Sequence, residues 1–148
     1  MATPYSDIFS LFLANIQDYV IDDMYDTSID DFETYATTFL QKAIPLFDNC
    51  QQDLSDRSDV LKTFYIDLTL TEQSILSDLM TLAWLKKEIN NILEMRNHLI
   101  SGDYKAFSSA NNLKEKRIWY DSLNKEVDVN LTKYGYSNND WSTFFTTS

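Results

Sequence analysis

Glycine and proline are scarce in this sequence, and their scarcity indicates the class of fold. Two glycines and two prolines occur among 148 residues, whereas average usage would give about ten and about seven. Tight β-turns and glycine-rich phosphate loops depend on positive φ angles, which this chain can hardly supply. We therefore predict an all-α fold, a single-domain bundle of about four main helices over residues 1–135, followed by an aromatic C-terminal tail over residues 136–148.

Cysteine and histidine are nearly absent. Cys50 is the single cysteine, which excludes an internal disulfide framework and a cysteine-cluster zinc site. His98 is the single histidine, and no serine or cysteine nucleophile motif lies near it to indicate a catalytic triad. We expect a protein that is not an enzyme and that uses neither a cofactor nor a metal ion.

Long hydrophobic runs are also missing. The longest apolar run is far shorter than the roughly 18 residues of a membrane span, and the start MATPYSDIF lacks the basic region of a secretory signal. We expect a soluble, reduced, intracellular protein without a membrane partner.

Basic residues are scarce in one part of the chain only. Residues 1–60 carry twelve Asp or Glu against Lys42 and Arg57, whereas residues 61–148 carry eleven acidic and ten basic residues. Nearly all of the formal net charge of −11 therefore lies in the first 60 residues. Such asymmetry concerns partners and solubility rather than fold.

The acidic residues are densest between residues 18 and 33, which hold seven carboxylates and no base. A calcium loop needs alternating ligands and a central glycine, and this stretch has neither, so no metal site is expected. Three interpretations remain: a solvated corner between helices, a surface that repels nucleic-acid phosphates, and an imitation of a DNA backbone. The candidate DNA-channel surface comprises Asp22, Asp23, Asp26, Asp30, Asp31 and Glu33.

Hydrophobic periodicity predicts two helices in the first third of the chain. The first begins at Pro4 with Thr3 as its N-cap, because a proline at the first helical position loses no hydrogen bond. The second is capped by Ser28 and carries the clearest amphipathic pattern in the chain. Pro45 should kink or end it close to Ile44.

Two further helices are predicted in the second half. Thr69 and Glu72 form a capping box that opens one long helix over residues 70–100. This helix is apolar over much of its girth, so it is either central or also serves an interface. The last helix begins at Ser108 or Ser109 and ends at Gly135.

The segment between the second and third helices is predicted to be irregular. Residues 48–63 are polar and rich in turn residues, which is typical of a connection. Apolar side chains alternate briefly over residues 64–68, so this segment could be extended. In a helical protein we instead expect it to pack on the core just before the next helix.

Two surfaces are candidates for contacts with partners. The tail places Trp141, Phe144 and Phe145 among small polar residues, and with Tyr136 these aromatics form a candidate interface that docks on its own bundle or on a neighbour. The second surface is a basic cluster, formed by Lys114, Lys116 and Arg117. It is either a mixed helix face or half of a contact with another copy's acidic end, which suits a head-to-tail ring.

Three stretches carry a resemblance: PYSDIFSLFLANIQDY (4–19), DLTLTEQSILSDLMTLAWLKKEI (67–89) and DYKAFSSANNLKE (103–115). Together they resemble the small helical neck proteins of tailed bacteriophages, the head–tail connector or adaptor proteins. The motifs are helix caps and core patterns rather than chemistry. The acidic stretch and the aromatic tail match nothing that could be carried over from the family.

The resemblance implies a non-enzymatic virion structural protein in the phage neck, assembled in the host cytoplasm. Such proteins form a ring, typically of twelve copies, beneath the portal protein; the ring extends the DNA channel and docks the next neck or tail protein. DNA would pass through without sequence-specific binding. A terminal segment commonly reaches into the neighbouring ring, and residues 136–148 are the candidate here. The alternative is a small acidic inhibitor, a DNA-mimic or anti-defence protein, that binds a basic host protein.

Overall fold

Four long helices make up most of the molecule, as the sequence predicts. The structure is a computed structural model and describes residues 2–16, 24–98 and 103–138. The helices are α1 (Tyr5–Asn15), α3 (Ile29–Ala43), α4 (Leu70–His98) and α5 (Asp103–Asn138), with a short 3₁₀ turn η1 (Ile44–Leu46) after α3. The all-α, single-domain prediction is therefore confirmed.

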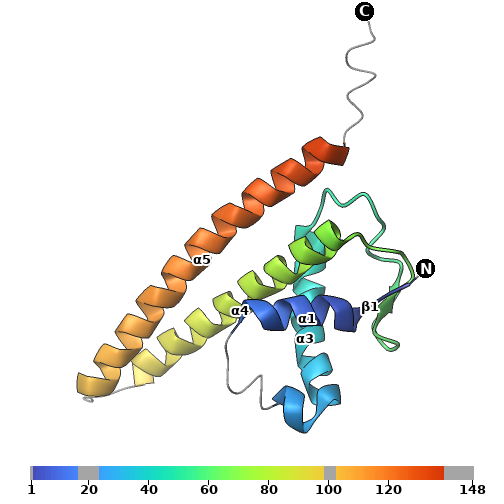
Figure 1. The fold of residues 1–148 in the computed structure, drawn as a ribbon. Helices are drawn as coiled ribbons and strands as arrows, with labels where there is room; N and C mark the ends of the chain where they lie inside the picture. Colours follow the sequence, from blue (N-terminus) through green and yellow to red (C-terminus); the bar gives the residue numbers. More distant parts are fainter. Residues whose placement is uncertain (1, 17–23, 99–102, 139–148) are drawn as a thin grey trace, which may run out of the picture.

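α4 is the central helix of the bundle. It packs against α1, α3 and α5, and Figure 1 shows α1 and α3 crossing its first half while α5 runs back along its length. The end of α4 and the start of α5 extend beyond the other helices as a two-helix arm. This position explains why α4 is apolar on more than one face.

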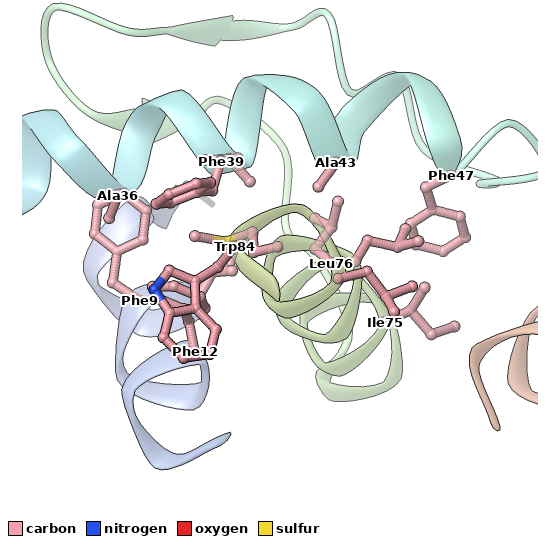
Figure 2. Close-up of a cluster of buried hydrophobic side chains, with 14 of the residues drawn as sticks. Phe9, Phe12, Ala36, Phe39, Ala43, Phe47, Ile75, Leu76 and Trp84 are labelled. Atoms are coloured by element: carbon pink, nitrogen blue, oxygen red, sulfur yellow. The ribbon is translucent and has the colours of Figure 1, made fainter. Parts of the chain in front are cut away.

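Aromatic side chains fill the centre of the core. Figure 2 shows Phe9 and Phe12 of α1, Phe39 of α3 and Trp84 of α4 converging on the same region, and each is at most 2% exposed. The rings of Phe12 and Phe39 lie 5.9 Å apart between centroids. Full burial of one such side chain stabilises the fold by about 1.5–3 kcal/mol. Because its members come from α1, α3 and α4, the cluster holds these three helices together.

A small sheet, which the sequence pattern does not predict, closes one end of the core. It has the order β1-β3-β2 and consists of two-residue antiparallel strands, β1 (Thr3–Pro4), β2 (Arg57–Ser58) and β3 (Thr63–Phe64). Phe64 is fully buried, which agrees with the expectation that residues 64–68 pack on the core. β1 and β3 are about sixty residues apart in the sequence, so no local pattern predicts their pairing, whereas β2 and β3 are close neighbours within the segment predicted to be irregular.

Thr3 does not cap the first helix, so that prediction is wrong. Pro4 is the N-cap residue, in extended backbone geometry, and Tyr5 begins α1. The Thr3 hydroxyl instead donates to the carbonyl of Ile66 at 2.9 Å and accepts from the N–H of Leu68 at 2.9 Å. The hydroxyl that the local pattern assigns to the N-cap is therefore used in tertiary contacts with Ile66 and Leu68.

Both predicted ends of the last helix are wrong. α5 begins at Asp103 rather than at Ser108 or Ser109, since no glycine or proline interrupts the segment and an acid suits the positive helix end. It also continues through Gly135 to Asn138. A Cβ at Gly135 would lie 3.3 Å from Nδ2 of Asn49, so this glycine allows a close approach instead of ending the helix.

The other predicted caps are confirmed. The Ser28 hydroxyl accepts from the N–H of Asp31 at 3.4 Å. In the capping box, the N–H of Thr69 donates to Glu72 at 2.9 Å and the N–H of Glu72 donates to Thr69 at 3.1 Å. α3 ends at Ala43, just before the proline-containing turn η1.

Candidate functional site

A groove of about 930 Å³ separates α3 from α5. α4 forms its floor because it packs against both flanking helices, which make little contact with each other there. In Figure 1, α3 and α5 lie on different sides of α4. We call this feature the α3–α5 groove.

The inside of the α3–α5 groove is apolar. Leu79 and Leu82 of α4 lie on the floor and are nearly fully buried, and Phe39 and Val127 contribute buried side chains from the two walls. Ala83 and Leu131 are half-buried beside them. Grooves with an apolar floor between helices are a common way of receiving an amphipathic helix.

The rim of the α3–α5 groove is positively charged, in contrast to the chain as a whole. Three exposed lysines line it, Lys42 from α3 and Lys86 and Lys87 from α4, against one carboxylate, Asp128. Within the described part of the chain none of these lysines belongs to an ion pair. The Lys87 ammonium lies 4.8 Å from the ring centroid of Tyr35. An anionic surface would therefore meet uncompensated charge here.

A buried hydrogen-bond cluster fastens the end of α5, which forms one wall of the groove. The Tyr134 hydroxyl donates to the carboxylate of Glu72 at 2.7 Å and accepts from the N–H of Gln51 at 2.8 Å. Nearby, Nδ2 of Asn49 donates to the carbonyl of Leu131 at 3.0 Å. These bonds join α5 to the start of α4 and to the segment that follows α3.

The charges in this cluster shift the protonation equilibria of its members. Burial raises the pKa of Tyr134, and the neighbouring Glu72 carboxylate raises it further. Burial also acts to raise the pKa of Glu72, but hydrogen bonds from Tyr134 and Thr69 outweigh it and leave this pKa below the ordinary 4.5. Burial and the Glu72 carboxylate raise the pKa of the Cys50 thiol. Glu72 is the charged member, and the other two stay protonated.

A second attachment holds α5 further along the groove. The rings of Trp84 and Trp119 meet edge to face with centroids 5.8 Å apart. The Lys116 ammonium lies 3.0 Å from the Glu88 carboxylate and 5.2 Å from the centroid of the Trp84 ring. Lys116 is thus occupied within its own chain, while Lys114 and Arg117 of the predicted basic cluster are exposed.

The predicted acidic residues that the structure describes gather at the start of α3. Asp26 lies in a helical turn over residues 24–27 and Asp30 and Asp31 in the first turn of α3, all three exposed. Glu33 is half-buried, and its carboxylate lies 3.3 Å from the ammonium of Lys62. Asp22 and Asp23 lie outside the described residues.

Two apolar side chains accompany these carboxylates on the surface. Tyr25 is 43% exposed and Ile29 is 49% exposed. We use the name acidic corner for the exposed set at this place, which comprises Tyr25, Asp26, Ile29, Asp30 and Asp31. The sequence shows no base between residues 19 and 41, and the ion pair of Lys62 with Glu33 involves none of the residues of this corner.

The candidate aromatic interface is described only at its first member. Tyr136 is 59% exposed and belongs to the last turn of α5, whereas Trp141, Phe144 and Phe145 lie outside the described residues. Whether they dock on their own bundle or on a neighbour stays a prediction.

The described residues offer no arrangement of ligands for a metal ion. No group of three or more His, Cys, Asp or Glu side chains comes together there. The Cys50 thiol has a raised pKa, which is the opposite of the shift that activates a nucleophilic cysteine. None of the described helices is long and apolar enough to span a membrane.

Comparisons with known proteins give no match: no protein-family model fits the chain, and no curated protein or solved structure is significantly similar to it.

Proposed function

We propose that this chain is a non-enzymatic virion structural protein, a head–tail connector that assembles as a ring beneath the portal of a tailed bacteriophage. The observation that carries its role as an assembly protein is the α3–α5 groove, an apolar channel with a basic rim that the described residues of one chain leave uncovered. The phage setting is supported by the resemblance of the stretches 4–19, 67–89 and 103–115 to neck proteins.

The architecture is suited to a structural protein that binds other proteins of an assembly. α5 is fastened to the bundle at Tyr134 and again at Trp119, so both walls of the groove are held at a set separation before a partner arrives. Preorganised walls lower the entropy lost on binding. The two-helix arm of α4 and α5 projects from the bundle as a further surface for the portal or for the next neck protein (Figure 1).

A ring that encloses the DNA channel also requires weak affinity for DNA. Protein–DNA affinity depends mainly on contacts between basic residues and phosphates, and a net charge of −11 opposes them. Acidic residues that face the lumen would let the duplex slide through without sequence-specific binding.

Mass spectrometry of purified virions tests this proposal. The protein is expected in the particles at about the copy number of the portal protein, and the purified chain is expected to bind isolated portal rings. If the virions lack the protein, the connector proposal is wrong.

The second candidate function is an acidic inhibitor, favoured by the acidic corner with its three exposed aspartates. Such an inhibitor would bind a basic host protein in a one-to-one complex by imitating DNA phosphates. It would be absent from virions, and duplex DNA would compete for its target. Virion composition therefore separates the two functions.

A further inference from the structure

We propose that copies of this chain associate head to tail, with the acidic corner of one copy seated in the α3–α5 groove of the next. This inference rests on the proposed self-assembly and names the two surfaces that make the contact. It places Asp26, Asp30 and Asp31 between copies of the chain rather than in the DNA channel.

Charge complementarity selects the second copy as the occupant of the groove. The rim presents three lysines and one aspartate, whereas the acidic corner presents three exposed aspartates. The positive end of the α3 dipole, equivalent to about half a charge, does not cancel three carboxylates. Opposite potentials of this kind direct encounter and set the register of an interface.

Apolar complementarity supplies a second, independent match. Tyr25 and Ile29 are close to half exposed in the acidic corner, and the groove offers an apolar floor formed by Leu79, Leu82 and Ala83. Exposed apolar side chains beside charges are typical of an interface core with a polar rim. A strand of DNA would leave this apolar floor without a partner, which favours a protein occupant.

The two surfaces lie apart on one molecule, so they cannot satisfy each other within a chain. Asp31 and Lys42 belong to opposite ends of the same helix, separated by roughly 16 Å at 1.5 Å per residue. Because α3 is a rigid element of the core, the separation is set by the fold. A contact between two different patches is heterologous, and its repetition closes a ring when the rotation allows.

Charge-reversal variants of the full chain test the contact. The groove variant carries Lys42→Glu and Lys86→Glu, and the corner variant carries Asp26→Lys and Asp30→Lys. Each variant alone pairs like charges and should self-associate at least about tenfold more weakly than the wild type. A one-to-one mixture restores attraction at every contact and should recover association, as should a chain with all four substitutions. Sedimentation velocity and native mass spectrometry measure the species.

A matched control for the groove variant carries the same change of net charge outside both surfaces. Lys125→Glu with Lys133→Glu reverses two exposed lysines of α5 that neither line the groove nor belong to the predicted basic cluster, and it should associate like the wild type. Far-UV circular dichroism and urea unfolding establish that every variant is folded.

Several outcomes would overturn the inference. If the groove variant and the corner variant each associate like the wild type, the acidic corner is not at the contact between copies, and its aspartates could face the DNA channel. If both variants are folded but their one-to-one mixture stays dissociated, the corner of one copy does not bind the groove of the next. If Trp141→Ser with Phe144→Ser abolishes association while charge reversal does not, the aromatic tail rather than the acidic corner carries the association. A wild-type chain that stays monomeric alone assigns the groove to another protein. None of these results decides whether the protein is in virions, so the connector proposal is judged separately.

Discussion

The Tyr134 hydroxyl connects three segments of the chain through one oxygen atom. It donates to Glu72 at the start of α4 and accepts from Gln51 in the connection that follows α3, and its ring meets Phe47 at 5.1 Å between centroids. Tyr134 is 5% exposed and Glu72 is 2% exposed, so water has little access to the bond between them. The position of the α5 wall therefore depends on this residue.

Replacement of Tyr134 by Phe should lower the free energy of unfolding by about 1–3 kcal/mol, because the buried Glu72 carboxylate and the N–H of Gln51 lose their partner. Urea unfolding measures the loss. The Cys50 thiol, 3.9 Å from the Tyr134 hydroxyl oxygen, should also react faster with iodoacetamide as the end of α5 opens more often.

The control for this prediction is Tyr65→Phe, which removes a hydroxyl from a side chain that is 49% exposed. It should change stability by less than about 0.5 kcal/mol. Equal unfolding midpoints for Tyr134→Phe and Tyr65→Phe would show that the buried cluster does not hold α5.

At the scale of elements, most of the structure follows from local rules and the exceptions have long-range causes. The caps at Ser28 and Thr69 follow from their own neighbours in sequence, and the structure confirms both. By sequence alone Thr3 fits the role of a helix N-cap and Gly135 that of a helix end, yet in the structure each contacts a distant segment instead. Local pattern cannot show a partner more than sixty residues away.

Replacement of Thr3 by Val tests the attachment of the small sheet. Valine keeps the shape of the side chain but leaves the N–H of Leu68 and the carbonyl of Ile66 without the hydroxyl that joins them to β1. A loss of about 1–3 kcal/mol is expected, with faster hydrogen exchange of amides in residues 63–68. The helical content of α1 should not change, because Thr3 does not cap this helix.

Thr34→Val is the matched change for this experiment. The Thr34 hydroxyl is exposed and donates only to the carbonyl of Asp30 within its own helix, so a change below about 0.5 kcal/mol is expected. Unaltered exchange in residues 63–68 of the Thr3 variant would contradict the assigned role of the hydroxyl.

At the scale of the whole molecule, two opposite effects govern stability as the pH falls. Protonation of exposed carboxylates relieves the self-repulsion of a chain with net charge −11. Glu72 and Asp59 act in the other direction, since their pKa values lie below the ordinary 4.5 and 3.8. A hydrogen bond from Tyr5 is the main cause at Asp59, and it outweighs the effect of burial.

A carboxylate with a lowered pKa stabilises the fold above its ordinary pKa, and this stabilisation is lost as the pH falls through the folded-state pKa. The double variant Glu72→Gln with Asp59→Asn lacks this term. Its deficit in unfolding free energy relative to the wild type should be constant above roughly pH 5 and should shrink towards pH 3.

Urea unfolding across this pH range measures the deficit, with the exposed Asp26→Asn as the control that keeps both carboxylates. A deficit in the double variant that is independent of pH would contradict the assignment. The double variant carries two negative charges fewer than the wild type, so the Asp26→Asn control, which removes one exposed charge, shows how much a change of net charge contributes to the difference curve.

The amino-acid sequence by itself determined the fold class, the helix count and the acidic asymmetry of this protein. These properties depend on composition and on spacings of three or four residues, which act within a single helix. The broad apolar girth of α4 also indicated a central helix, and its contacts with α1, α3 and α5 agree with that interpretation.

Only the tertiary structure decided where the α3–α5 groove lies and which charges meet there. Lys42 and Lys86 are separated by 44 positions along a chain with a net charge of −11, and they share a rim only because α3 and α4 cross. The same holds for Tyr134, whose partners Glu72 and Gln51 approach it through the packing of α5. Sequence spacing acts along one element, whereas a site between elements depends on how they pack.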